Sequence, residues 1–220
     1  MICAGLRFSG TMGPDFEFER AAFASGYIRV AGVDEVGRGP LAGPVTAAAV
    51  VLDPARIPDG LNDSKKLSKA ARERLYDQIM EVADVSIAHA SVAEIEELNI
   101  LRASHLAMTR ALDGLKVPAD YVLIDGNMVP RELVLPAQTI IKGDGRSQSI
   151  AAASIMAKIC RDRVMVDLAQ QHPGYGWETN MGYGSKSHMA ALQNLGVTPH
   201  HRRLFKPVHN ILYQANLPSN

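Results

Sequence analysis

Strand-like apolar stretches recur along the first two thirds of the chain. Residues 27–35 (YIRVAGVDE) and 45–53 (VTAAAVVLD) are rich in small and β-branched side chains, and a short loop with glycines and prolines separates them. We expect these two segments to pair as a hairpin. Further strands are predicted at 84–90 (DVSIAHA), 121–125 (YVLID) and 139–142 (TIIK). Because 121–125 is almost wholly apolar, this strand should be buried on both faces.

Apolar residues at helical spacing predict helices between and after these strands. One helix starts at Ser68, and Ser91 with Glu94 has the spacing of a capping box at the start of another. A third covers about 101–115, and the longest covers 147–172. The apolar positions are Ala71, Leu75, Ile79 and Val82 in the first helix, Leu101, Met108, Leu112 and Leu115 in the third, and Ala152, Met156, Cys160, Val164 and Leu168 in the last.

The order of these elements predicts the fold class. Strands that first form a hairpin and then alternate with helices indicate an α/β protein with a mixed sheet flanked by helices, followed by a helical C-terminal portion. The small residues at 151–154 should let the longest helix approach another backbone closely. With 220 residues, no internal repeat and no linker, we expect a single domain over residues 15–220, preceded by a flexible arm at 1–14.

Composition narrows the class of protein. No apolar run approaches the roughly 20 residues of a bilayer span, and the N-terminus does not resemble a secretory signal, so we expect no membrane contact and a cytoplasmic location. Cys3 and Cys160 are too few for a disulfide framework or a cysteine zinc site, and Cys160 should be a small core residue. The formal net charge of zero argues against binding nucleic acid through bulk positive charge.

The charge is unevenly distributed, however. Residues 171–220 carry four cationic side chains against Glu178, together with five of the seven histidines. This local excess of basic residues suits contact with phosphates, although a solvated basic surface also explains it. The four cationic residues are Lys186, Arg202, Arg203 and Lys206.

Residues 33–45 (VDEVGRGPLAGPV) allow two interpretations. Their G-x-G-x-x-A spacing is that of a dinucleotide-binding turn, whereas Asp34 and Glu35 directly before it form half of a metal site. A dinucleotide turn must lead into a helix, and a strand pattern follows here, so that interpretation fails. Because neighbouring strand residues point to opposite faces, Asp34 and Glu35 share one site only if the strand ends or bends there. Otherwise one is buried and the other exposed.

Asp125 and Asp144 are further candidates for chemistry. Each follows a short apolar strand and precedes a glycine, which suits a site but is also a common turn. Carboxylate oxygens are the ligands that Mg²⁺ and Mn²⁺ prefer. His105 lies on the apolar side of its helix, where we expect a hydrogen-bonded interior histidine rather than a metal ligand.

Seven motifs in order, between about Tyr27 and Val208, resemble the bacterial type 2 ribonucleases H, the ribonuclease HII family. The resemblance implies a ribonuclease H-like fold and a monomeric endonuclease. Such an enzyme hydrolyses the RNA strand of RNA·DNA hybrids and incises at single ribonucleotides in duplex DNA. The motifs are GVDEVGRGPLAGPV, NDSKKLS, IDGN, KGD, SIAAASIMAKICRDR, GYGSKSH and HHRRLFKPV.

The resemblance also assigns roles to residues. It makes the four acids ligands of two divalent ions, Mn²⁺ or Mg²⁺, roughly 3.5–4 Å apart, and it implies products with 3′-hydroxyl and 5′-phosphate ends. The loop at 37–39 would sense the 2′-hydroxyl through its backbone, and Tyr183 would pack on the sugar at an RNA-to-DNA junction. Ser64 and Lys65 match a segment that contacts the nucleic-acid backbone. The metal ligands are Asp34, Glu35, Asp125 and Asp144, and the loop is Gly37, Arg38 and Gly39.

Three positions depart from the family pattern. Met181 stands where relatives often have lysine, Ser185 replaces threonine and Leu204 replaces serine, so we expect one phosphate contact fewer but an intact acidic set. The tail 210–220 (NILYQANLPSN) shows no sliding-clamp motif. Two other classes stay open: a non-catalytic module that binds RNA·DNA hybrids, which the complete acidic set disfavours, and a metal-dependent enzyme for small phosphates, which leaves the glycine loop unexplained.

Overall fold

A five-stranded mixed sheet forms the centre of the protein. The computed structural model describes residues 13–214, and its strands lie in the order β3-β2-β1-β4-β5. β1 pairs antiparallel with β2 and parallel with β4, β2 pairs antiparallel with β3, and β4 pairs parallel with β5, so the predicted hairpin and mixed sheet are confirmed. The strands are β1 (Val30–Val36), β2 (Val45–Val51), β3 (Asp84–Ala90), β4 (Tyr121–Asp125) and β5 (Ala137–Ile140).

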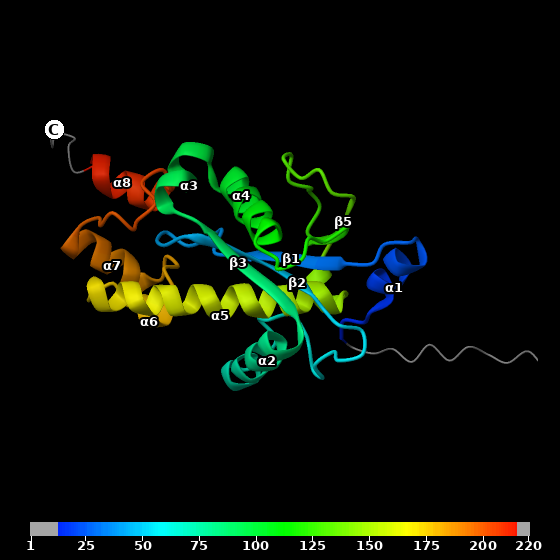
Figure 1. The fold of residues 1–220 in the computed structure, drawn as a ribbon. Coiled ribbons are helices and arrows are strands. Elements are labelled where there is room, and N and C mark those ends of the chain that lie inside the picture. The colour runs from blue at the N-terminus through cyan, green and yellow to red at the C-terminus, as the bar shows by residue number, and fades with distance from the viewer. Residues whose placement is uncertain (1–12, 215–220) are drawn as a thin grey trace, which may run out of the picture.

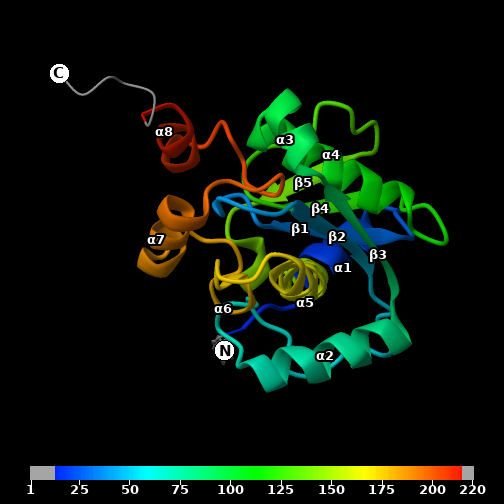
Figure 2. The same ribbon diagram turned by 90° about the vertical axis from the view of Figure 1, so that its left-hand side faces the viewer.

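Helices cover both faces of this sheet. Figure 1 shows α5 (Gln148–Gln171) and α2 (Lys69–Val82) below it, and α3 (Val92–Leu98) and α4 (Ile100–Asp113) above it. The end-on view in Figure 2 places α7 and α8 to one side, which is the predicted helical C-terminal portion. The remaining helices are α1 (Glu17–Ala24), the 3₁₀ helix η1 (Gly143–Gly145), α6 (Trp177–Asn180), α7 (Lys186–Leu195) and α8 (Lys206–Gln214). Among the helices of residues 13–214, none is long and apolar enough to cross a bilayer.

Alternate residues of β2 divide the core between the two faces of the sheet. Ala47 and Ala49 pack toward α4, while Ala48 and Val50 pack toward α5 and α2. α5 lies very close to the sheet at Gly32, where a Cβ would collide with the backbone of Ser149 and Ile150, just before the small residues 151–154 for which close approach is predicted. The start of α5 is therefore held firmly against β1, the strand that carries Asp34 and Glu35.

Three local predictions need correction or restriction. β5 ends at Ile140 and not at residue 142, because Lys142 has a left-handed backbone (φ 57°) that turns the chain into η1. Cys160 is half-buried and not a core residue, with its Sγ 3.9 Å from Nε2 of His89. Most of the arm predicted at 1–14 lies outside the described residues; of the two that are described, Pro14 is buried.

Two buried histidines hold the C-terminal portion together. Nδ1 of His188 donates to the carbonyl oxygen of Tyr183 (2.9 Å), so its Nε2 accepts from Nε1 of Trp177 (3.0 Å) and Nε2 of His201 (3.1 Å). Nδ1 of His201 in turn accepts from the Thr198 backbone (3.0 Å). In the neutral form of His188 and His201, all four ring nitrogens donate or accept a hydrogen bond. A second proton on either ring would point at hydrogen-bond donors and find no acceptor. Burial accordingly lowers the pKa of His188 and lowers the pKa of His201 to about 3.

This pair makes folding sensitive to acid. A histidine whose pKa is lowered in the folded state costs nothing above its unfolded pKa of about 6.5, and it destabilises the fold progressively as pH falls from there toward the folded value. We expect His201 to remove about 1.4 kcal/mol of unfolding free energy per pH unit over that window. Urea unfolding of wild type and His201→Asn between pH 7.5 and 5 measures this pH dependence of the unfolding free energy. The exposed His209→Asn is the control, and equal pH slopes for wild type and His201→Asn would contradict the neutral pair.

Candidate active site

Asp34 and Glu35 lie at the C-terminal end of β1, which ends one residue after Glu35, at Val36. β1 stays paired with β2 through Val36, so Asp34 faces the α5 side and Glu35 the α4 side. On its other edge, however, β1 pairs with β4 only as far as Val33. The sheet therefore opens beside the two carboxylates, and a site that straddles this opening is reached from both faces.

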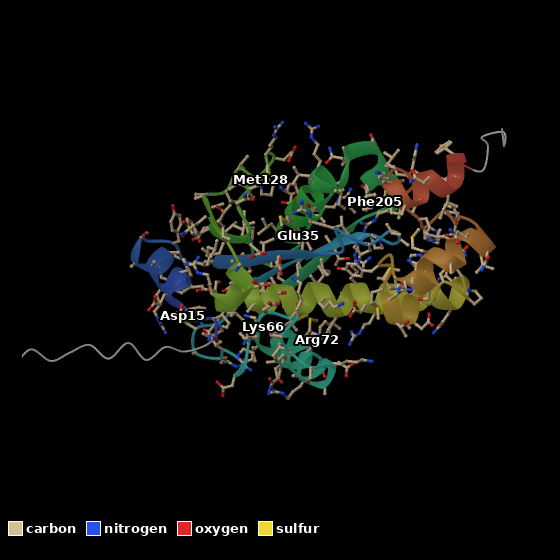
Figure 3. All side chains as sticks on the ribbon, turned by 180° about the vertical axis from the view of Figure 1, so that it is seen from behind. Asp15, Glu35, Lys66, Arg72, Met128 and Phe205 are labelled. Carbon is tan, nitrogen blue, oxygen red and sulfur yellow. The ribbon has the colours of Figure 1, made fainter. Side chains whose placement is uncertain are left out.

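Asp125 and Asp144 lie at the same opening. Asp125 is the last residue of β4, one step beyond the last β1–β4 pair, and its Oδ1 accepts a 2.6 Å hydrogen bond from the Gly143 amide. Asp144 follows in η1. In Figure 3 Glu35 lies at the level of the sheet, with Met128 on the α4 side and Lys66 on the α5 side. The four predicted acids thus come from β1, β4 and η1, at the place where β1 and β4 separate.

Mutual repulsion and burial disturb three of these acids. Burial, followed by the charges of Glu35 and Asp125, holds the pKa of Asp34 well above its usual value, against the hydrogen bond of Ser154. Burial also raises the pKa of Glu35, which Arg38 opposes through a 3.3 Å contact between its Nη1 and Oε1 of Glu35. Such crowding of carboxylates is unfavourable without a cation and is typical of functional sites.

The loop before α2 contributes one cation and one further acid. Desolvation pulls the pKa of Lys65 down, but the charges of Asp34, Asp63 and Asp144 outweigh it and raise that pKa. Burial and the charge of Asp63 raise the pKa of Asp144. Ser64 is buried and its Oγ accepts from Ser154 Oγ (2.9 Å), so it lies beneath the site rather than on its surface. Lys65 is exposed at the edge of the acidic group.

The donor set fits divalent ions such as Mg²⁺ or Mn²⁺. All four predicted ligands are carboxylates, the oxygen donors that these ions prefer, and a cation would relieve the repulsion that, together with burial, raises the pKa of Asp34 and of Asp144. Within residues 13–214, no three acidic, histidine or cysteine side chains surround a single point closely enough to hold an ion as they stand.

Beside the acids, residues 37–39 form a turn next to Tyr183, of which Arg38 and Gly39 are exposed. Gly37 is buried with φ +93°, and a Cβ there would stand 2.2 Å from Nε of Arg161. Gly39 is exposed, and a Cβ there would meet only Cε1 of Tyr183, at an ordinary 3.5 Å. The fold itself therefore requires glycine at 37 but not at 39, which leaves Gly39 open to close approach by another molecule.

This difference predicts opposite outcomes for two matched substitutions. Gly37→Ala should lower the unfolding free energy by about 2–4 kcal/mol, because its backbone is strained for alanine and its Cβ meets Arg161. Gly39→Ala should unfold within about 0.5 kcal/mol of wild type and yet bind a ribonucleotide-containing duplex about tenfold more weakly. Thermal unfolding and fluorescence anisotropy measure the two effects. Normal binding by a folded Gly39→Ala protein would contradict a backbone contact at this turn.

His105 differs from its prediction. Its ring is buried, as expected, but no hydrogen bond joins it to a described side chain or backbone group. Instead it lines a cavity of about 160 Å³ with Glu35, Arg38 and Asp125. Burial, followed by the charge of Arg38, lowers the pKa of His105. His105 is therefore a neighbour of the acidic site, a role that its place on an apolar helix face does not reveal.

The positions that depart from the family pattern have structural roles of their own. Met181 has a left-handed backbone (φ 51°) and packs against the C-terminal core, while its carbonyl accepts from Nη1 of Arg161 (3.0 Å). Ser185 caps α7 by accepting from the His188 amide (3.1 Å), as threonine would. Leu204 is 65% exposed. The cation expected at 181 is thus replaced by an apolar contact.

Several neighbours of the site were not predicted. Asp63 and Ser154 lie within quoted motifs, but nothing in their spacing distinguishes them from other polar residues. Arg161 and Arg202 are fully buried beneath the glycine turn, although sequence places one in an ordinary helix and the other in a basic patch.

Known proteins resemble this chain along most of its length. The family described as ribonuclease HII matches residues 31–208. A ribonuclease HII of Ruegeria pomeroyi is 69% identical over 205 residues, covering 93% of this chain and 88% of the relative. One of Roseobacter denitrificans is 72% identical over 191 residues, covering 87% of this chain and 96% of the relative.

Solved structures agree in fold. Ribonuclease H2 from Pyrococcus horikoshii superposes with a TM-score of 0.71 at 26% identity, covering 85% of this chain and 98% of that one. The ribonuclease HII of the PCNA complex from Archaeoglobus fulgidus gives 0.66 at 24% identity (81% and 95% covered), and Bst ribonuclease HIII with Mn²⁺ gives 0.68 at 18% (86% and 70% covered). The last two show the fold alone. Sequence match and architecture together place this chain in the ribonuclease HII family, the endonucleases that hydrolyse the RNA strand of RNA·DNA hybrids.

Proposed function

We propose that this ribonuclease cleaves by a two-ion mechanism and also incises duplex DNA at single embedded ribonucleotides. The observation that carries the proposal is the group of carboxylates at the opening between β1 and β4, directly beside an exposed backbone turn. A site for chemistry and a surface for recognition are thus separated by only a few residues of one chain segment.

Asp34, Glu35, Asp125 and Asp144 would hold the ions. When bound, a pair of divalent ions supplies an activated water and stabilises the leaving 3′-oxygen, which yields 3′-hydroxyl and 5′-phosphate ends. The residues themselves orient the site: Gly143 fixes Asp125 through its amide, and Arg38 restrains Glu35. Mn²⁺ is present in the solved Bst ribonuclease HIII. For this chain we propose Mn²⁺ or Mg²⁺ because carboxylate oxygens are ligands that suit both ions.

Recognition would use the turn at 37–39 together with Tyr183. The 2′-hydroxyl is the group that distinguishes RNA from DNA, and it is both a donor and an acceptor. The amides of Arg38 and Gly39 lie in an exposed segment and are suited to donate to it. Tyr183 is 46% exposed beside Gly39, where its ring would pack on the adjacent sugar. Lys65 would neutralise a backbone phosphate near the acids, with Ser64 supporting it from below.

A sliding clamp is a partner that one relative of this chain binds. The Archaeoglobus relative was solved with PCNA, whereas the tail of this chain, of which 215–220 lie outside the described residues, has no clamp motif in its sequence. We propose a monomer that engages its duplex without that contact. The monomeric state and the cytoplasmic location stay predictions.

The decisive experiment uses a labelled DNA duplex with one ribonucleotide. The protein is incubated with Mn²⁺, Mg²⁺ or a chelator, alongside an RNA·DNA hybrid and an all-DNA duplex. We expect metal-dependent cuts in the first two substrates, with 3′-hydroxyl ends, and none in the third. Folded protein that cuts the hybrid but not the single ribonucleotide would overturn the proposed substrate range, and protein that binds both without cutting would be a binding module.

A further inference from the structure

Two arginines lie buried beneath the glycine turn without acidic partners. Arg161 comes from α5 and Arg202 from the segment before α8; both are fully buried, and no ion pair joins either guanidinium to a carboxylate in the described part of the chain. Burying a charge without a counterion is costly. Burial lowers the pKa of Arg161 to about 10, and burial together with the nearby Arg161 lowers the pKa of Arg202 to about 9, so both remain charged at neutral pH.

Their hydrogen bonds go to backbone carbonyls, nearly all within one segment. Five of the six accepting carbonyls belong to residues 37–44, and the sixth belongs to Met181. Nε, Nη1 and Nη2 of Arg202 donate to Gly43 (3.0 Å), Arg38 (2.9 Å) and Gly37 (2.6 Å), and those of Arg161 donate to Pro44 (2.9 Å), Met181 (3.0 Å) and Ala42 (3.1 Å). The two guanidinium groups therefore fix the turn from its interior side.

This attachment decides where the amides of the turn point. In a trans peptide the N–H group points opposite to the carbonyl of the preceding residue, and the described residues have no cis peptide bond. Because the carbonyls of Gly37 and Arg38 point inward to Arg202, the amides of Arg38 and Gly39 point outward. Neither amide donates to any group in residues 13–214. Two consecutive free amides form a small donor surface beside the acids.

We propose that Arg161 and Arg202 are positioning residues for recognition of the ribonucleotide 2′-hydroxyl. Arg202 holds two carbonyls of the turn inward so that the amides of Arg38 and Gly39 stay directed at the substrate. Arg161 ties the rest of the segment to the carbonyl of Met181, and so sets the turn against the loop that carries Tyr183. This role rests on the proposed function, since it assigns the means by which that site selects RNA.

The test compares Arg202→Lys, Arg202→Met, Arg161→Lys and Arg161→Met with wild type. Lysine keeps the charge but lacks the planar set of donors that reaches three carbonyls. Arg163→Met is the matched control, because Arg163 is exposed on the same helix and packs on Tyr76. In chelator, where no cleavage occurs, anisotropy gives the affinity for an all-DNA duplex and for the same duplex with one ribonucleotide. We expect the preference for the ribonucleotide to fall at least about fivefold in all four variants and to stay unchanged in the control.

A purely structural role would lower stability without changing this preference. Variants that are folded by circular dichroism and still prefer the ribonucleotide as wild type does would overturn the proposal. If the methionine variants do not fold, the ribonucleotide preference of the lysine variants tests the proposal. Amide exchange on the wild type gives a measurement free of substitutions: the Arg38 and Gly39 amides should exchange fast in the free protein and become protected by the ribonucleotide duplex but not by the all-DNA duplex. Equal protection by both would also overturn it, whereas a wild type with no preference would refute the proposed function itself.

Discussion

Asp34→Asn is expected to lower kcat for metal-dependent cleavage by about 10³-fold or more while the protein still binds an RNA·DNA hybrid. Asparagine keeps the shape of the side chain but removes the charge that would hold an ion at the centre of the acidic group. Asp34 is the most buried of the four acids and the one whose pKa is raised by all three others. Single-turnover cleavage in Mn²⁺ and Mg²⁺, with binding measured in chelator, separates the two effects.

The same substitution should stabilise the metal-free protein. The folded state binds a proton on Asp34 more tightly than the unfolded state, since burial and like charges raise the pKa of Asp34. The cost of its ionisation is therefore felt at neutral pH and disappears as pH falls below about 4. We expect a gain of about 1–2 kcal/mol in unfolding free energy at pH 7 in chelator, shrinking in acid. Added Mn²⁺ should stabilise wild type more than Asp34→Asn.

Asp77→Asn is the matched control, because Asp77 is exposed on α2 and distant from the carboxylate group. It should change neither cleavage nor the response to metal. If Asp34→Asn retained turnover within tenfold of wild type, the assignment of Asp34 as a metal ligand would be wrong. If it lost turnover but was less stable than wild type in chelator, ionised Asp34 would not lower the stability of the metal-free protein, contrary to this prediction.

The acidic site illustrates how far the sequence carried the prediction. Asp125 is at the end of β4 as the Asp-Gly pattern predicts, whereas Asp144 lies in η1, four residues after the end of β5, and does not terminate a strand. Alternation along a single strand predicts that Asp34 and Glu35 share a site only if the strand ends or bends there. The pairing of β1 with β4 ends at Val33 and Ile124, so Asp34 and Asp125, one step further along each strand, lie at the opening between them. Where this pairing ends becomes known only when the sheet is assembled.

The buried polar residues were harder to predict for a related reason. Patterning distinguishes apolar from polar positions, so an arginine within a helix or beside a basic cluster is expected to be exposed. Each of the buried guanidinium groups of Arg161 and Arg202 donates to three backbone carbonyls, and five of these six carbonyls belong to the distant segment 37–44, a condition that no local window contains. His105 and Cys160 show the converse: both lie on apolar helix positions, and only the packed structure shows that one borders the acidic site while the other is half exposed.

Tyr183→Ala is expected to lower kcat/KM about 10²-fold for a duplex with one ribonucleotide, and by much less for a continuous RNA·DNA hybrid. The ring lies beside Gly39, where a Cβ would come within 3.5 Å of its Cε1, and loss of aromatic packing on a nucleotide costs about 1–3 kcal/mol. The two substrates should differ because cleavage at a single ribonucleotide always takes place at an RNA-to-DNA junction, whereas most cleavage positions in a continuous RNA·DNA hybrid have no such junction.

Backbone and ring can be separated at this residue. Its carbonyl accepts from His188 Nδ1 (2.9 Å) and from the Ser185 amide (2.8 Å), so the loop should keep its course in Tyr183→Ala, with stability within about 0.5 kcal/mol of wild type. Tyr183→Phe retains the ring and should cleave both substrates like wild type, since packing rather than the hydroxyl is the expected contact. If both variants cut the junction normally, Tyr183 would not contact the sugar. If Tyr183→Phe failed as badly as Tyr183→Ala, a hydrogen bond from the hydroxyl would replace packing as the basis of junction recognition.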